Sequence, residues 1–203
     1  MNPKKAVTDH HILKALTERW SPYGFADKPV AEADLLSLFE AARWAASSYN
    51  EQPWNYLVAL KDNPHEFGRL LSCLVEPNQA WAKTAPVLVL GVVSLRFAKN
   101  NKENRAAVHD LGLASANLSI EATTRGLSVH QMIGIHPDNA RAVCQIPEHF
   151  EAWTALAIGY KADPALMADD LKERDLTPRQ RKPLKDFVFG SQWGKSSPFL
   201  AKP

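Results

Sequence analysis

Apolar residues recur at helical spacing in several stretches of the chain. In the clearest stretch, Leu35, Leu38, Phe39 and Ala42 fall at i, i+3, i+4 and i+7, so they share one face of a helix. A second long pattern ends at Gly126, a natural C-terminal stop, and its Gly, Ala and Ser residues would let another helix approach closely. Helices are expected over five ranges: 10–19, 33–46, 65–74, 106–125 and 138–145.

Strand patterns fall between these helices. Trp54, Tyr56, Val58 and Leu60 alternate with other residues, as in a half-buried strand. The run from Val87 to Val93 is continuously apolar, which is typical of a central strand covered on both faces. Two further strands are expected over 127–130 and 153–158, and 164–175 is expected to be a linker or a short helix.

Length and composition favour one globular domain over residues 1–203. The hydrophobic fraction is 45% and the charged fraction 23%, values ordinary for a folded protein. The net charge of +2 is too small to indicate a nucleic-acid partner. No secretory signal and no run of 18 or more apolar residues is visible, so no membrane partner and a cytoplasmic location are expected. Cys73 and Cys144 lack the spacing of a disulfide framework or zinc site, and are expected to be buried thiols.

A polar segment links the second predicted helix to the first strand. It reads Ser-Ser-Tyr-Asn-Glu-Gln-Pro-Trp, and its Ser, Asn and Gln side chains donate and accept in fixed directions. Such a loop suits a polar ligand, although turn chemistry alone explains many similar loops. The segment resembles the signature of the nitroreductase family of flavin enzymes. The matching residues are Ser47, Ser48, Asn50, Gln52, Pro53 and Trp54.

Three other segments resemble the same family in the same order. Arg19-Trp20-Ser21 resembles its opening motif, although Tyr23 stands where the family usually has a basic residue. Ile133-Gly134 resembles a turn whose backbone N–H groups face the flavin N5. Arg179 and Arg181 resemble its C-terminal basic pair, and on an extended segment two residues so spaced point to one side, where their guanidinium groups could grip a phosphate.

The resemblance implies an α+β fold with a central, mostly antiparallel sheet flanked by helices, in a domain-swapped homodimer. The C-terminal arm, about 164–203, would wrap the partner subunit. FMN is the implied cofactor, and no side chain is assigned a catalytic role because the flavin performs the chemistry. The expected cofactor-binding residues are Arg19, Trp20, Ser21, Ala46, Ser47, Ser48, Asn50, Gln52, Ile133, Gly134, Arg179 and Arg181.

The implied activity is hydride transfer from NAD(P)H through FMN to a nitroaromatic, a quinone or a similar small aromatic acceptor, by a ping-pong cycle. Two alternatives stay open at this point: a relative that uses the flavin for dehalogenation or flavin breakdown, and a flavin carrier or sensor without turnover. No Gly-x-Gly-x-x-Gly follows a strand, and the seven histidines show no metal spacing, so a Rossmann nicotinamide domain and a metal site are not expected.

Overall fold

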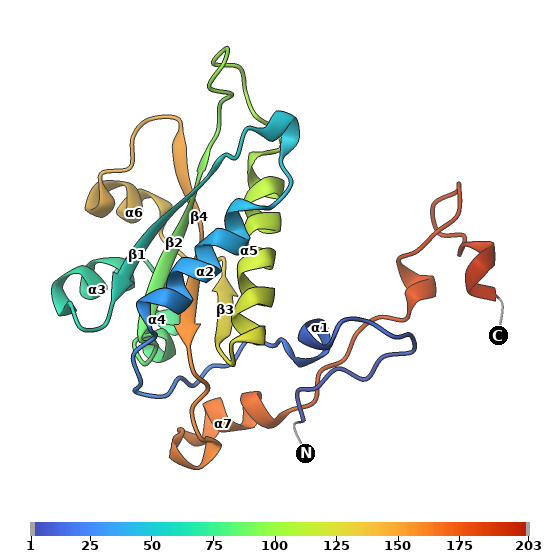
Figure 1. The fold of residues 1–203 in the computed structure, drawn as a ribbon, viewed down its shortest axis with the longest axis horizontal. Helices are drawn as coiled ribbons and strands as arrows, with labels where there is room; N and C mark the ends of the chain where they lie inside the picture. The colour runs from blue at the N-terminus through green and yellow to red at the C-terminus, as the bar shows by residue number, and fades with distance from the viewer. Residues whose placement is uncertain (1–2, 202–203) are drawn as a thin grey trace.

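A four-stranded sheet forms the centre of the computed structural model, which describes residues 3–201. The strands are β1 (Trp54–Leu60), β2 (Val87–Ser94), β3 (Ser128–Met132) and β4 (Phe150–Gly159). Their order is β1-β2-β4-β3, and every neighbouring pair is antiparallel. The expected α+β fold with an antiparallel sheet is therefore confirmed for the single chain (Figure 1).

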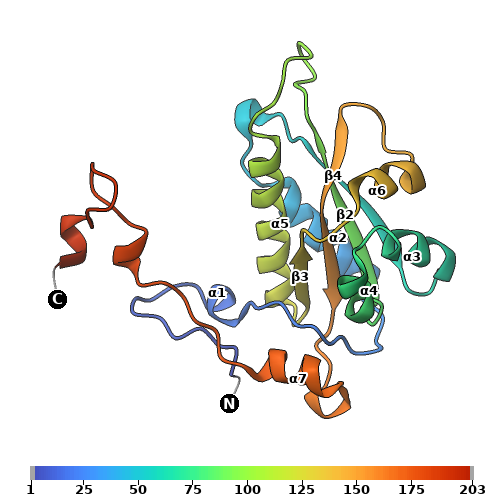
Figure 2. The same cartoon turned by 180° about the vertical axis from the view of Figure 1, so that it is seen from behind.

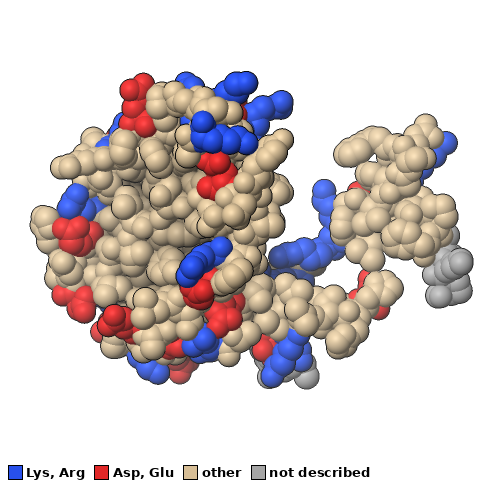
Figure 3. Space-filling model, turned by 45° about the horizontal axis from the view of Figure 1, so that its top comes forward, with Lys and Arg blue, Asp and Glu red and all other residues tan. Residues whose placement is uncertain are grey.

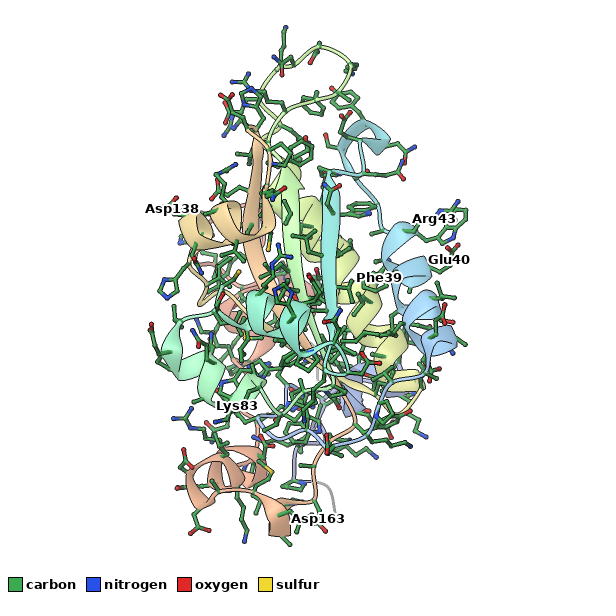
Figure 4. The ribbon with its side chains drawn as sticks, turned by 90° about the vertical axis from the view of Figure 1, so that its left-hand side faces the viewer. Phe39, Glu40, Arg43, Lys83, Asp138 and Asp163 are labelled. Atoms are coloured by element: carbon green, nitrogen blue, oxygen red, sulfur yellow. The ribbon has the colours of Figure 1, made fainter. Side chains whose placement is uncertain are left out.

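Helices cover both faces of this sheet. One face carries α2 (Glu32–Arg43) and α5 (Ala107–Thr124), while the other carries α3 (Pro64–Leu71), α4 (Glu76–Ala82) and α6 (Pro137–Cys144). Figure 4 shows Glu40 and Arg43 of α2 on one side and Asp138 of α6 on the other. The terminal regions add α1 (Lys14–Glu18), α7 (Asp169–Leu176) and four short 3-10 turns: Ser48–Asn50, Pro164–Leu166, Leu184–Asp186 and Pro198–Ala201.

The central strand β2 shows how the sequence pattern produces the two cores. Val87 and Val89 pack toward α2 and α5, whereas Leu88 and Leu90 pack toward α3, α4 and α6. Successive side chains of a strand point to opposite faces, so only a continuously apolar run can fill both cores. The prediction of a central strand covered on both faces is confirmed.

Two helix predictions differ from the structure. The first helix begins at Lys14 rather than at His10, because the backbone of Leu13, with a ψ of 138°, is still extended. No helix was predicted over α4, although it buries Trp81 and Ala82. At seven residues, α4 is too short to display a helical period.

The N-terminal segment and the stretch that follows α7 run side by side near α1, and the C-terminal segment then extends away from the body (Figure 1 and Figure 2). The segment containing α7 still packs on its own chain, since the buried Asp175 carboxylate accepts the backbone N–H groups of Tyr23 and Gly24. Beyond α7 the chain leaves the body, with Phe187, Trp193 and Phe199 56%, 91% and 65% exposed. Figure 3 shows this segment as a separate lobe.

Within residues 3–201, no helix combines the length and apolar character that crossing a bilayer requires. The same residues contain no cluster of three or more His, Cys, Asp or Glu side chains arranged to hold a metal ion. Cys73 is buried and Cys144 is half-buried, and both are free thiols.

Candidate cofactor site

Three arginines, Arg19, Arg179 and Arg181, form what we call the arginine cluster. Arg19 follows α1, and the other two lie just after α7, so residues far apart in sequence meet where the terminal segments run together. Nη1 of Arg19 donates to the Ser21 hydroxyl at 3.3 Å. In Figure 3, basic side chains gather where the C-terminal segment leaves the body.

The cluster holds positive charge without a carboxylate. Burial lowers the pKa of Arg19, and the charge of Arg181 lowers it further. Burial also lowers the pKa of Arg179, followed by the charges of Arg19 and Arg181. Arginine remains protonated despite such shifts. Because none of the three pairs with an acid among residues 3–201, the cluster suits an anion carrying more than one negative charge.

The two C-terminal arginines do different things in the single chain. Nη1 of Arg179 donates to the carbonyl of Arg19 at 2.6 Å, and Nη2 donates to the carbonyl of Thr17 at 2.9 Å. Its Nε is buried without a partner in the described chain. Arg181 is exposed, and its one hydrogen bond goes to the neighbouring carbonyl of Gln180. Arg179 thus positions the Arg19 backbone, while Arg181 keeps most of its donors for a ligand.

A cavity of about 970 Å³ opens beside the cluster. Its walls come from the N-terminal segment, with Ile12 and Leu16, and from the C-terminal segment, with Leu184 and Phe187. All three cluster arginines line it. The combination of apolar walls and a few charged groups is typical of a cofactor pocket.

Trp20 points away from this cavity into a second one of about 310 Å³, lined among others by Lys5, Thr123, Ser128 and Lys161. The indole Nε1 is buried and has no partner among the described residues. The Lys161 ammonium lies 5.8 Å from the Trp20 ring centre. The side chain of Trp20 therefore supports the wall behind Arg19.

Residues 46–52, which we call the polar loop, adopt a strained backbone. Tyr49, Asn50 and Gln52 have φ angles of 53°, 55° and 52°, in the left-handed region that side chains disfavour. The Ser47 hydroxyl accepts the N–H of Gln52 at 3.1 Å, which closes the loop. No hydrogen bond involves the Ser48 hydroxyl or the Asn50 side-chain amide within the described chain. Strain of this kind is concentrated at ligand-binding sites.

Asp110, which was not predicted as a site residue, supports this loop through a hydrogen bond. It lies in the first turn of α5, is 2% exposed, and its Oδ2 accepts the N–H of Ser48 at 3.0 Å. His109 Nδ1 lies 3.1 Å from its other oxygen. The available signal was one acid on the inward stripe of a helix that is otherwise lined by Leu111, Ala114 and Leu118.

Replacing Asp110 tests this support. We expect Asp110→Ala to reduce the free energy of unfolding by about 1–3 kcal/mol, because it leaves the Ser48 N–H without its acceptor. Asp110→Asn keeps one acceptor oxygen and should recover most of that loss. Urea unfolding followed by circular dichroism measures both. Equal stabilities of the Ala and wild-type proteins would show that Asp110 does not support the loop.

Ile133 and Gly134 follow β3 on a bend that α4 supports. The Gly134 carbonyl accepts the N–H of Val75 at 3.1 Å and the Asn78 side-chain amide at 3.0 Å. A Cβ at Gly134 would lie 2.6 Å from Asn78 Nδ2, so a larger residue would collide there. The N–H groups of Ile133 and Gly134 donate to nothing within residues 3–201. Two adjacent backbone donors are therefore available to a ligand.

His130 and Tyr23 fix this strand against the N-terminal segment. His130 Nδ1 donates to the Pro22 carbonyl at 2.8 Å, and burial lowers the pKa of the imidazole, which favours its neutral form. The Tyr23 ring packs edge-on against His130 and Trp81, with centroids 4.8 and 5.2 Å away. Tyr23 thus fills a structural position in place of the basic residue usual in the family. The hydrogen bond between His130 and Pro22 thus ties β3, which leads to Ile133 and Gly134, to the segment that follows Arg19.

Apart from Ile133 and Gly134, which follow β3, the expected site residues form two separate groups in one chain. The arginine cluster lies beside the C-terminal end of α5, since Arg19 and Thr123 line one cavity. The polar loop lies at the opposite end, where Ser48 contacts Asp110. Asp110 and Thr123 are about 20 Å apart along the helix, at roughly 1.5 Å per residue. Figure 1 shows the two groups at opposite ends of α5.

Known proteins resemble this chain over most of its length. The model of the Nitroreductase family matches residues 16–160. A 15.4 kDa protein of Mycolicibacterium smegmatis is 32% identical over 124 residues, which cover 61% of this chain and 82% of that protein. The FMN reductase [NAD(P)H] of Bacillus subtilis is 24% identical over 172 residues, covering 76% of this chain and 67% of the relative.

A solved structure extends the likeness to nearly the whole fold. The crystal structure of an oxidoreductase containing FMN superposes with a TM-score of 0.88 and is 31% identical, covering 97% of this chain and 98% of the other.

Proposed function

This chain belongs to the nitroreductase family, and we propose that it is an FMN-dependent NAD(P)H oxidoreductase that works as a homodimer. The observation that carries the proposal is the division of the site into the arginine cluster and the polar loop, at opposite ends of α5. The acceptor class that we propose is a nitroaromatic, a quinone or a similar small aromatic molecule. The ping-pong order and the cytoplasmic location stay predictions.

The residues of the chain fit FMN in their chemistry. A phosphate needs several cationic donors, and the three arginines of the cluster line one cavity, whose walls also include Asp9. The ring and ribityl chain need directional polar groups, which Ser48 and Asn50 offer. Close approach of a flat ring to the backbone is possible at Gly134, which lacks a side chain.

A second copy brings the two groups together. The ribityl chain that joins the ring to the phosphate is shorter than the distance along α5 between the two groups. In a two-fold dimer, residue i contacts residue j of the other copy and j contacts i. If two α5 helices pack antiparallel, each polar loop meets the arginine cluster of the other copy. The dimer then contains two complete sites, and a monomer contains none.

The exposed face of α5 is suited to such packing. Gly112, Leu113, Ala116 and Asn117 are exposed along one stripe, and none carries a charge. Small residues allow helices to approach closely. The apolar side chains exposed on the terminal segments, including Leu13 and Phe187, would be buried against the second copy. We propose that the part of the C-terminal arm beyond α7 wraps that copy.

FMN, when bound, supplies the hydride-transfer chemistry, whereas the protein supplies position, charge and exclusion of water. Arg19 and Arg181 would neutralise the phosphate, and Ser21 orients Arg19. The N–H groups of Ile133 and Gly134 would donate to the ring edge where electron density increases. Ala46, Ser47, Ser48, Asn50 and Gln52 of the second copy would form the opposite wall. Trp20 and Arg179 hold the backbone around Arg19.

Anaerobic reduction tests the proposed function directly. The purified protein mixed with FMN should retain a yellow chromophore through gel filtration, and NADH or NADPH should bleach it without oxygen. Stopped-flow absorbance measures the rate, and addition of a nitroaromatic should restore the colour. A protein that gains no chromophore would overturn the proposal. A yellow protein that neither nucleotide bleaches would instead be a carrier or sensor.

A further inference from the structure

An aromatic shelf with a cation above it lies beside the polar loop. The rings of Tyr49 and Phe97 meet edge to face, with centroids 6.0 Å apart and planes at 81°. The Lys99 ammonium lies 4.4 Å from the Tyr49 ring centre and 5.8 Å from that of Phe97. We call these three residues the aromatic shelf.

The shelf is held in place on both sides. The Glu51 carboxylate accepts the N–H of Ala98, which ties the 96–105 segment to the polar loop. Arg96 pairs with Glu103 in a β-bridge, and the Phe97 N–H donates to the Lys102 carbonyl at 2.8 Å. The Arg96 guanidinium donates to the Asn101 carbonyl at 2.8 Å. The segment is therefore a structured hairpin that presents Lys99 in a defined position.

Tyr49 and Lys99 are exposed, whereas Phe97 is half-buried. Tyr49 is 81% exposed and is displayed by a backbone with a φ of 53°, a conformation that costs free energy. Residues 96–105 contain four basic side chains and one acid. None of the basic side chains forms an ion pair within the described part of the chain. Exposed aromatic area beside an unpaired cation favours a ligand with a flat ring and a negative group.

We propose that the physiological electron acceptor is a planar aromatic molecule that carries a carboxylate or sulfonate group. Its ring packs against Tyr49 and Phe97, and its anionic group meets Lys99. The inference rests on the proposed function, because Tyr49 lies between Ser48 and Asn50, which are assigned to the flavin of the second copy. It extends that function by naming the charge of the acceptor.

A matched ligand pair isolates the charge. 4-Nitrobenzoate and 4-nitrobenzamide have nearly the same shape, but only the former is anionic. Equilibrium dialysis against the oxidised, FMN-loaded protein, without NAD(P)H, measures binding apart from turnover. We expect 4-nitrobenzoate to bind about three- to tenfold more tightly, as one partly screened charge pair allows. The KM values for the two acceptors should differ in the same direction.

Two lysine variants locate the effect. Lys99→Met should bring the ratio of the two dissociation constants close to one, whereas Lys102→Met removes the same charge from the same hairpin but should preserve the ratio. If both variants lower the ratio equally, the hairpin acts as a diffuse positive field and the shelf assignment is wrong. If Lys99→Met raises the KM for NADPH and leaves the ratio unchanged, Lys99 serves the nicotinamide nucleotide instead.

The outcomes distinguish a failure of this inference from a failure of the proposed function. A wild-type protein that binds FMN and is bleached by NAD(P)H, but binds both nitro compounds equally, overturns the acceptor assignment alone. A protein that does not bind FMN overturns both.

Discussion

Gly112→Arg should convert the protein into a folded monomer that does not retain FMN. Gly112 is exposed on α5, and nothing lies within 4 Å of the position that a Cβ would occupy. The substitution is therefore harmless within one chain, and it should stabilise the helix by up to about 1 kcal/mol, since glycine is a poor helix former. In the proposed dimer, the same side chain places two like charges in a close helix contact.

The chain offers a matched control for this experiment. Gly68 is an exposed glycine in α3, on the other face of the sheet, and a Cβ there also meets nothing within 4 Å. Gly68→Arg should remain dimeric and yellow. Light scattering during gel filtration distinguishes 22.6 kDa from twice that mass, and flavin absorbance reports FMN. A monomeric Gly112→Arg protein that keeps its flavin would place the whole site in one chain. A dimeric one would place the interface elsewhere.

Local sequence patterns predicted some elements of the fold and missed others. Local patterns identified β2, because an uninterrupted apolar run of strand length, from Val87 to Val93, is typical of a strand that is buried on both faces. They failed at α4, where seven residues are held by packing of Trp81 rather than by their own periodicity. Local pattern is informative where burial is continuous, and it is weak where tertiary contacts determine a short helix.

The sequence indicated which chemical groups form the candidate site, but not how these groups are arranged in space. The motifs around Arg19, Ser47 and Arg181 contain side chains suited to binding FMN. No motif indicates that these side chains lie at opposite ends of α5 in one chain. Arg179 and Arg181 both line one cavity, but Arg179 gives two of its guanidinium nitrogens to the carbonyls of Thr17 and Arg19, which the sequence did not indicate. Asp110 was not predicted as a site residue, because its contact with the Ser48 N–H joins two segments that are far apart in the sequence.

That difference between the two arginines leads to the second large effect, a loss of FMN affinity in Arg181→Ala. Arg181 is exposed and has one hydrogen bond, to the adjacent Gln180 carbonyl, so its removal leaves no buried group unpaired. Charge-assisted hydrogen bonds contribute about 1.5–3 kcal/mol, so we expect the dissociation constant for FMN to rise roughly ten- to hundredfold. The thermal stability of the flavin-free protein should not fall, because the substitution also removes a positive charge that repels Arg19 and Arg179.

Two comparisons identify the phosphate as the group that Arg181 binds. Lys185→Ala removes a positive charge from the same segment but outside the arginine cluster, and it should keep nearly wild-type FMN affinity. Riboflavin lacks the phosphate, so its weaker binding should be nearly the same in wild-type and Arg181→Ala proteins. Fluorescence titration with both flavins gives the dissociation constants. If Arg181→Ala weakens riboflavin as much as FMN, the guanidinium acts on the ring or on the dimer contact, because a phosphate contact predicts a loss confined to FMN.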